Sequence, residues 1–350
     1  MFEINETKEK IRTQPQSFCY LCSGPAKTIY SGLKDKIFAV WGEWNFKLCQ
    51  NRDCGLLWLD PMPVKEDIGK TYLDYYTHSQ TDKVSKSFSR GLIDFIKTGY
   101  LNRKYNYNSD SLNFWQKIFG LLIYLDPGLK SEIDSEVMYL KSKPKGLLLD
   151  VGCGNGKFLG LMRELGWQVE GTEIDPKAVE IARNNKLQVG AGELAEQRYP
   201  VNSFDVITLN SVIEHVQDPL NLLKESCRIL KDGGVLMILT PNTESRTHRI
   251  YKDKWLNLDP PRHLHLFSPK NLRSLAGKAG FKNVSVWTTS RNLRSSLLGS
   301  WDFESKGCHQ MGGWQPWSRR ILAKILQLIE EIILRIKKNI GDEIILKAQK

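Results

Sequence analysis

The sequence predicts an α/β protein built on a doubly wound parallel sheet, and three observations predict it. An apolar strand pattern at 147–151 runs into a glycine-rich turn. A second strand pattern, at 168–173, ends in an acidic residue. Apolar strand patterns then alternate with helix patterns along the chain, which is typical of a sheet covered by helices on both faces.

The turn after the first strand carries Gly152, Gly154 and Gly156. Glycine is needed where a turn requires backbone angles closed to other residues and where a ligand presses against the main chain. The turn therefore predicts a nucleotide-type cofactor. Asp150 places an anion directly before the turn, which suits a ligand carrying positive charge. This favours S-adenosylmethionine, with its ammonium and sulfonium groups, over NAD.

The second strand supplies the group that a cofactor with a ribose needs, a hydroxyl acceptor at the end of the neighbouring strand. Glu173 lies at roughly the twenty-residue interval expected between a glycine turn and a ribose-binding carboxylate. We therefore predict Glu173 as the ribose ligand. Asp175 and Pro176 follow as the N-cap and first-turn proline of a helix that continues through Ala182, so Asp175 is predicted to be structural.

Three further strands are predicted, at 187–189, 204–209 and 234–240. Continuous apolar runs of this kind mark strands that are buried on both faces. Ligands in such sheets bind beyond the carboxyl ends of the strands. Glu193 and Asn210 are therefore predicted to border the cofactor or the substrate. For Glu193 two interpretations stay open, contact with the adenine edge and a solvated loop acid.

Five spaced motifs resemble those of class I S-adenosylmethionine-dependent methyltransferases, in the same order. They lie at 149–156, 203–207, 214–216, 230–234 and 279–281. The resemblance implies methyl transfer from S-adenosylmethionine (EC 2.1.1.-) and a Rossmann-like sheet of seven strands, the last of them antiparallel. It places the sixth strand at 282–288 and the seventh at 342–348. The catalytic domain would then span 141–350, with a helical insertion at about 295–340.

The N-terminal part carries two cysteine pairs and a glycine after the last cysteine: Cys19 and Cys22, then Cys49 and Cys54, then Gly55. The pairs predict a zinc ribbon within residues 1–65, in which four thiolates close a tetrahedral structural site. The glycine suits the tight turn of a zinc knuckle. The second pair is spaced more widely than usual, and isolated buried cysteines are the alternative interpretation. We expect no disulfide framework and a cytoplasmic protein, because no secretory signal opens the sequence.

A zinc ribbon followed by this domain is similar to the zinc-ribbon methyltransferases, which include sugar C-methyltransferases and enzymes of glycan or natural-product pathways. Three further segments resemble that group, at 55–63, 72–76 and 260–268. The chain departs from the sugar C-methyltransferases at Arg262, where those enzymes have glutamate. The change weakens the resemblance to C-methylation and leaves an anion-binding role open for Arg262.

The resemblance also implies a set of catalytic residues. In the similar sugar C-methyltransferases the histidine that matches His263 acts as the general base. A histidine that matches His215 and a tyrosine near Tyr76 assist it. Histidine suits this role because the pKa of its side chain ordinarily lies near neutral pH. The alternative is that these histidines are structural.

Composition limits the partners. The chain has 350 residues, a net charge of +11 and a pI near 9.2. A basic chain favours anionic partners, such as nucleotide-linked sugars, lipid phosphates, a membrane surface or nucleic acid. The basic residues are scattered and form no recognised RNA-binding motif, so we expect no nucleic-acid partner and hold RNA methylation as a minor alternative. The expected acceptor is a small molecule, a sugar nucleotide or a glycan precursor.

Two alternatives of other classes also stay open. The first is an NAD-type oxidoreductase, which the glycine spacing permits but Asp150 and the segment with Glu214 and His215 disfavour. The second is a non-catalytic protein that keeps the cofactor fold for binding.

Two apolar stretches outside the sheet predict a lid over the substrate, one in the helical linker at 66–140 and one at 318–340. In the second, apolar residues recur on one helical face: Ile321, Ile325, Leu328, Ile329, Ile332 and Ile336. Three interpretations stay open for this face. It packs on its own domain, on a second subunit in a homodimer, or on the inner face of the membrane as a peripheral helix.

Overall fold

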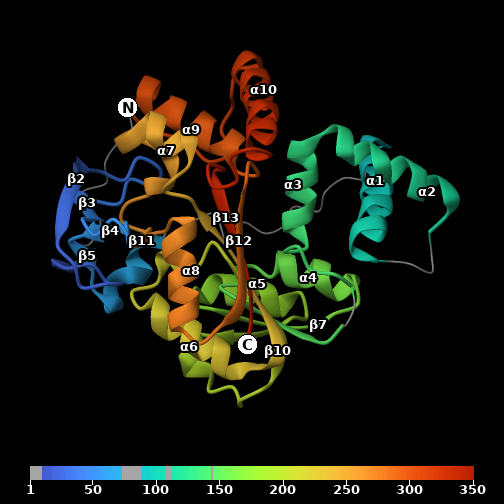
Figure 1. The fold of residues 1–350 in the computed structure, drawn as a ribbon, viewed down its shortest axis with the longest axis horizontal. Coiled ribbons are helices and arrows are strands. Elements are labelled where there is room, and N and C mark those ends of the chain that lie inside the picture. Colours follow the sequence, from blue (N-terminus) through green and yellow to red (C-terminus); the bar gives the residue numbers. More distant parts are fainter. Residues whose placement is uncertain (1–9, 73–87, 108–111, 143–144) are drawn as a thin grey trace. The chain divides into compact units, whose positions relative to one another are not determined.

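The computed structural model describes residues 10–72, 88–107, 112–142 and 145–350 (Figure 1). The chain divides into two compact units. The first unit lies within residues 1–75, 209–227 and 238–349, and the second within 76–208 and 228–237 together with Lys350.

One seven-stranded sheet takes its strands in the order β12-β13-β10-β9-β6-β7-β8. β6 pairs in parallel with β7, and β7 with β8, whereas β12 and β13 are antiparallel. The bounds are β6 Leu147–Val151, β7 Gln168–Glu173, β8 Gln188–Ala191, β9 Phe204–Asn210, β10 Leu230–Pro241, β12 Lys282–Thr289 and β13 Glu343–Gln349. This confirms the predicted α/β fold and its mixed seven-stranded sheet.

The central strands are buried on both faces, as their continuous apolar runs predict. Leu148 and Leu149 of β6 are fully buried, and so are Ile207 and Leu209 of β9. The run Leu236–Leu239 of β10 is fully buried too. Side chains on both faces of a strand can be apolar only where both faces are covered, so these strands form the middle of the sheet.

The second unit contains helices that alternate with strands β6, β7 and β8, and a separate group of helices that precedes these strands in the chain. The helices of the group are α1 Phe88–Tyr105, α2 Phe114–Phe119, η3 Gly120–Leu125 and α3 Pro127–Glu136. α1 and α2 approach closely at Gly99, where an added Cβ would lie 1.8 Å from the carbonyl oxygen of Gln116. The buried carboxylate of Asp134 accepts hydrogen bonds from the hydroxyls of Tyr100 and Tyr105, at 2.6 and 2.8 Å. α4 Lys157–Glu164 and α5 Pro176–Asn184 complete the unit, with η4 Leu194–Gln197.

In the first unit, the N-terminal strands form a four-stranded sheet of order β11-β4-β3-β2 and a small pair, β1-β5. The bounds are β1 Thr13–Gln14, β2 Ala26–Leu33, β3 Trp44–Cys49, β4 Leu57–Asp60, β5 Met62–Pro63 and β11 His265–Leu266. Trp44, Phe46 and Leu59 form a core with Trp255 and Leu266. A strand from residue 265 therefore completes a sheet whose other strands come from the first sixty residues.

The remaining helices of the first unit connect these strands. They are η1 Lys65–Tyr72, η5 Ile213–His215, α6 Pro219–Ile229, α7 Arg246–Tyr251, η6 Lys252–Lys254, η7 Leu256–Leu258, α8 Pro269–Lys278, α9 Leu293–Lys306 and α10 Trp317–Leu334. α9 and α10 lie in the chain between β12 and β13, where the sequence predicts a helical insertion. Among the described residues, none of the helices combines the length and apolar character that a membrane-crossing segment needs.

Candidate functional site

The glycine turn between β6 and α4 has backbone angles that suit glycine. The φ angles of Gly152, Gly154 and Gly156 are 68, 54 and 80°, all in the left-handed region. The amides of Gly152 and Cys153 donate to the carbonyl oxygen of Thr172 in β7, at 2.8 and 3.0 Å. These bonds fix the turn against the neighbouring strand.

Glu173, at the end of β7, is buried beside this turn and binds it directly. Its Oε2 accepts the amide of Gly154 at 2.8 Å, and its Oε1 accepts the amides of Ile174 and Asp175 at 2.8 and 2.9 Å. A carboxylate has about four acceptor positions, so acceptor capacity remains for a ligand hydroxyl. The predicted ribose ligand therefore also holds the turn in place.

Asp150, the last but one residue of β6, is also buried. The hydroxyl of Thr208 donates to its Oδ1 at 2.6 Å. Burial, with a contribution from the negative charge of Glu173, raises the pKa of Asp150 to about 7, against the opposing effect of the Thr208 hydrogen bond. A cationic ligand would stabilise this carboxylate. The residues of the second unit therefore fit S-adenosylmethionine, with Asp150 for its positive charge and Glu173 for its ribose.

Two other residues predicted to border the cofactor have different surroundings. Glu193 is exposed, and its side chain caps η4 in a reciprocal box in which Glu196 accepts the amide of Glu193 at 2.9 Å. This gives Glu193 a local structural role, and its contact with the cofactor stays a prediction. Asn210 ends β9 and is half-buried. Asp175 caps α5 and accepts the amide of Lys177 at 3.0 Å, as predicted.

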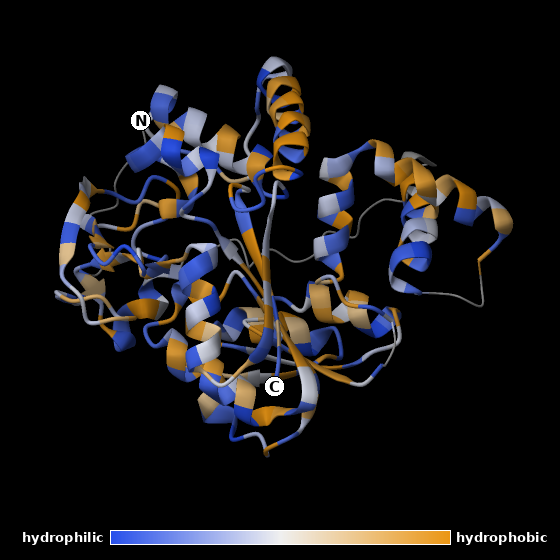
Figure 2. Ribbon diagram, in the orientation of Figure 1, coloured by the Kyte–Doolittle hydropathy of each residue, from blue (hydrophilic) through white to orange (hydrophobic). Residues whose placement is uncertain are grey.

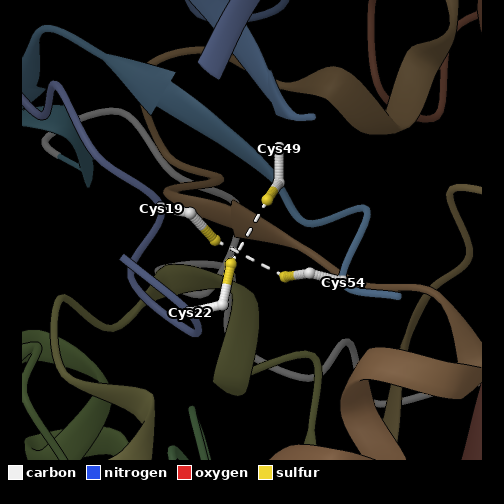
Figure 3. Close-up of side chains that lie close together, drawn as sticks. All are labelled: Cys19, Cys22, Cys49 and Cys54. Atoms are coloured by element: carbon white, nitrogen blue, oxygen red, sulfur yellow. Dashed lines mark hydrogen bonds between the residues drawn. The ribbon is translucent and has the colours of Figure 1, made fainter. Parts of the chain in front are cut away.

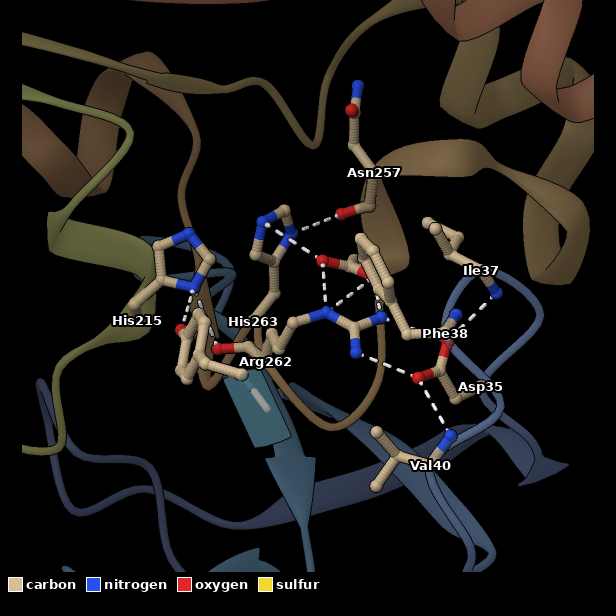
Figure 4. Close-up of polar contacts among 10 residues, drawn as sticks. Asp35, Ile37, Phe38, Val40, His215, Asn257, Arg262 and His263 are labelled. Atoms are coloured by element: carbon tan, nitrogen blue, oxygen red, sulfur yellow. Dashed lines mark hydrogen bonds and ion pairs between the residues drawn. The ribbon is translucent and has the colours of Figure 1, made fainter. Parts of the chain in front are cut away.

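In the first unit, His215 and His263 lie together although they come from segments far apart in the sequence (Figure 4). Their ring centroids are 4.7 Å apart, with the planes inclined at 67°. Glu214 joins them, because one ligand-type atom of each of the three residues lies within 4.8 Å of the others. A neutral imidazole uses the same nitrogen lone pair to accept a proton or to bind a metal ion. The cluster could therefore act as a general base or as a metal site.

Backbone carbonyl groups orient both imidazoles. His263 Nδ1 lies 2.7 Å from the carbonyl oxygen of Asn257, so this nitrogen carries the proton and Nε2 keeps its lone pair. His215 Nδ1 lies 3.0 Å from the carbonyl oxygen of Arg262 and 2.8 Å from the hydroxyl of Tyr72. Burial lowers the pKa of His263, and burial together with the neighbouring His263 lowers that of His215 to about 3.

Asp259 lies beside His263. Its Oδ2 lies 3.9 Å from Nε2 of His263, close enough to stabilise that ring when it is protonated. Asp259 has a φ of 38°, a left-handed conformation that turns the chain ahead of Pro260. Its charge opposes the effect of burial on the pKa of both histidines, but only His263 lies within ion-pair distance of it. His263 is therefore the better placed proton acceptor of the pair.

Arg262 has no room for an external anion, which overturns the anion-binding role left open by the sequence. Its side chain is fully buried and binds Asp35 through two nitrogens at 2.7 and 2.9 Å (Figure 4). Nε also donates to Asp259 at 3.0 Å. The ring of Phe38 covers the guanidinium at 4.7 Å. Arg262 instead holds the loop that carries Asp259 and His263 against the N-terminal sheet.

The four cysteines converge on one point, as Figure 3 shows. The Sγ atoms of Cys19 and Cys54 are 3.5 Å apart, those of Cys22 and Cys49 are 3.4 Å apart, and all four lie within 4.8 Å of one another. Thiolates at about 2.3 Å from a tetrahedral zinc ion would be about 3.8 Å from one another. The cluster therefore fits zinc closely. Gly55 has the positive φ of 61° that its predicted knuckle turn requires.

The cysteine cluster is connected to the histidine segment. Tyr20, between the first two cysteines, has its ring 5.2 Å from that of the buried His265. β11 pairs with β4, and the amide of Leu59 donates to the carbonyl oxygen of Leu264 at 3.0 Å. The amide of Leu264 donates to the carbonyl oxygen of Glu214 at 2.7 Å. The ribbon sheet therefore positions the segment that carries His263, and that segment is bonded in turn to Glu214, the residue before His215.

The third predicted catalytic residue, Tyr76, lies outside the described residues. The sequence interpretation missed Tyr72, which contacts His215, as well as Asp259 and Asn257, which contact His263. Tyr72 belongs to the same short segment as Tyr76, so the segment was identified but this tyrosine was not. Nothing in the local pattern around Asp259 or Asn257 marks them, because their partners are set by the fold of the loop.

Comparison with protein families adds an independent result. Residues 128–286 match a family model described as a methyltransferase domain. The ubiquinone biosynthesis O-methyltransferase of Idiomarina loihiensis is 28% identical over 153 residues, covering 40% of this chain and 63% of the relative. A probable S-adenosylmethionine-dependent methyltransferase of Mycobacterium tuberculosis is 32% identical over 156 residues, covering 43% of this chain and 55% of the relative. The match thus spans less than two thirds of each relative's length.

The chain was also compared with solved structures, which match it at low identity and low TM-score. A SAM-dependent methyltransferase from Archaeoglobus fulgidus has a TM-score of 0.44 and 18% identity, covering 68% of this chain and 100% of that one. Phosphoethanolamine N-methyltransferase 2 from Haemonchus contortus has a TM-score of 0.43 and 16% identity, covering 92% of this chain and 71% of that one.

Proposed function

We propose that this chain, which contains a class I S-adenosylmethionine-dependent methyltransferase domain over residues 128–286, transfers a methyl group to a small-molecule acceptor. The observation that carries the proposal is the pair of buried carboxylates at the glycine turn, Asp150 and Glu173. Two anions at this turn suit a cofactor with a positive charge and a ribose. Of the two, the charge of Asp150 directly before the turn disfavours the pyrophosphate of NAD, whereas a ribose-binding acid such as Glu173 suits either cofactor.

The raised pKa of Asp150 makes cofactor binding depend on pH. Only the ionised carboxylate attracts the ammonium group, and the pKa of about 7 means that protonation begins in the neutral range. Affinity for S-adenosylhomocysteine is therefore expected to fall as the pH falls, by about tenfold between pH 8 and pH 6. Calorimetric titration at the two pH values measures it. Asp150→Asn should bind more weakly and lose most of the dependence, whereas equal affinity of the wild type at both pH values would contradict this account.

For the chemistry, we propose His263 as the general base and His215 as its assistant. S-adenosylmethionine, when bound, supplies an electrophilic methyl group. The acceptor's proton would pass to Nε2 of His263, whose other nitrogen is held by Asn257 and whose protonated form Asp259 stabilises. His215 makes no ion pair within 4.0 Å among the described residues, and its Nδ1 is held by the carbonyl group of Arg262 and by Tyr72, so its proposed role is to position His263 and the acceptor.

We propose a sugar nucleotide or a glycan precursor as the acceptor class. The support is the resemblance of the ribbon and of residues 260–268 to the sugar-modifying group, and the basic charge of the chain, which favours a phosphorylated acceptor. The structure removes one argument against that resemblance, since Arg262 is occupied by two carboxylates and does not alter the charge offered to an acceptor. Some relatives are named as O-methyltransferases of ubiquinone biosynthesis, so a phenolic acceptor should be tested beside the sugar acceptors.

We propose that Cys19, Cys22, Cys49 and Cys54 bind a structural Zn²⁺ ion. The distances between their sulfur atoms and the closed set of four thiolates support it, because a site with four protein ligands has no open position for chemistry.

The test of the function is transfer of a labelled methyl group. The full chain is incubated with methyl-labelled S-adenosylmethionine and a panel of nucleotide sugars, glycan precursors and phenolic quinone precursors. Label in a sugar acceptor supports both the reaction and the acceptor class, label only in a phenol supports the reaction and overturns the sugar, and no transfer with any acceptor counts against the reaction.

A further inference from the structure

Helix α10 consists largely of hydrophobic residues (Figure 2), and many of its large apolar side chains are exposed to solvent. Eight large apolar residues in and around it are at least 43% exposed, and Trp314 and Ile336 are 82% and 83% exposed. The exposed residues are Trp314, Trp317, Ile321, Leu322, Ile325, Ile329, Ile332 and Ile336. Such a contiguous apolar surface marks an interaction site.

The helix is held to its own unit by a different face. Ala323 packs into a small cluster with Leu293 and Leu297 of α9. Gln327 donates to the carbonyl oxygen of Ser290 at 3.0 Å, and Glu330 binds Arg246 at 2.9 Å. The packing face of α10 is therefore made of Ala323, the partly buried Leu326 and polar residues. The apolar face is left uncovered by the described residues, because the contact with α9 uses the other side of the helix.

The charges of α10 are divided between the two faces. Both acids of the helix turn inward, since Glu330 is buried against Arg246 and Glu331 accepts the hydroxyl of Ser290 at 2.6 Å. Exposed cations flank the apolar face at both ends: Arg320 near the start, and Arg335, Lys337 and Lys338 after the end. A helix with an apolar face, basic flanks and tryptophans at one end has the composition of one that lies in a lipid interface.

We propose that α10 and its flanks form a peripheral membrane-binding surface, with the apolar face inserted among lipid chains and the cations against anionic headgroups. Charge complementarity selects this occupant over a second copy of the chain. An isologous dimer through this face would bring identical cationic flanks close to one another, which is unfavourable. An anionic lipid surface instead gains from each of these cations.

The inference goes beyond the proposed methyl transfer and does not depend on it, so it is tested without a methyl donor. The full chain is sedimented with vesicles of phosphatidylcholine alone and of phosphatidylcholine with about one third phosphatidylglycerol. The expected result is binding to the anionic vesicles, at least tenfold weaker to the neutral vesicles, and weakened by raising the salt from 0.1 to 0.5 M.

Two double variants distinguish binding through the apolar face of α10 from nonspecific hydrophobic binding. Ile325→Ser with Ile332→Ser should lower binding to anionic vesicles at least tenfold. Val201→Ser with Ile250→Ser removes equally exposed apolar residues elsewhere and should bind as the wild type does. No binding by the wild type, or equal loss in both variants, overturns the proposal. Light scattering that shows a dimer disrupted only by the α10 variant would also overturn it, in favour of a second copy.

Discussion

A His263→Ala variant is expected to lose roughly two to four orders of magnitude in kcat, the usual contribution of a positioned general base. The reason is local. Nε2 of His263 lies 3.9 Å from the carboxylate of Asp259, within ion-pair distance, and its tautomer is fixed by the carbonyl group of Asn257 at 2.7 Å. The measurement is steady-state kinetics with the acceptor found by labelled methyl transfer, together with titration of S-adenosylhomocysteine.

The titration decides between a catalytic and a structural cause. Cofactor affinity should stay within about threefold of the wild type, because the cofactor ligands Asp150 and Glu173 lie in the other unit. His309→Ala serves as the matched control, since that histidine pairs with Asp302 outside the cluster and should keep the wild-type kcat. A His263→Ala enzyme that keeps kcat within threefold would contradict the base assignment, and equal loss of cofactor binding would point to misfolding.

A Cys49→Ser variant is expected to lose its zinc and to unfold at a temperature lower by roughly 10 °C, because structural zinc contributes folding free energy directly. We expect the loss of zinc to disturb the segment that carries His263 as well. The sheet that starts at the cysteine cluster includes β11, and Tyr20 of the first knuckle packs on His265. Zinc content by atomic absorption and melting temperature by calorimetry measure the two effects.

Cys308→Ser is the control for this substitution, because Cys308 is exposed and lies outside the cluster. It should keep about one zinc ion per chain and the wild-type melting temperature. The zinc assignment fails if the purified wild type contains no zinc and neither binds added zinc nor gains stability from it.

The sheet and the turn were predictable because their causes are local. Apolar runs mark strands buried on both faces, and the strand bounds differ from the predicted ones by a few residues at most, except at β10, which begins at Leu230 rather than at 234. Gly55 and Asp175 behave as predicted because a positive φ and a helix cap depend on neighbouring residues.

The features that the sequence did not reveal depend on distant partners. Arg262 binds Asp35, 227 positions away, so a residue that reads as a free cation is buried and neutralised. Tyr72 and His215 meet across 143 positions. For α10 the periodicity identifies the apolar face correctly, but only the fold shows that the opposite face, with Ala323 and Gln327, is the one that packs. A pattern shows which residues share a face, whereas the fold decides what covers it.

The most direct test of a cofactor site at the glycine turn is calorimetric titration of the full chain with S-adenosylhomocysteine, compared between the wild type and Glu173→Ala. Glu180→Ala is the matched control, because Glu180 is an exposed acid on the helix that follows. The account predicts micromolar binding by the wild type and the control, and affinity at least about thirtyfold lower for Glu173→Ala, from the lost hydrogen bonds to a charged group. No binding by well-folded wild type, or unchanged affinity in Glu173→Ala, would contradict it.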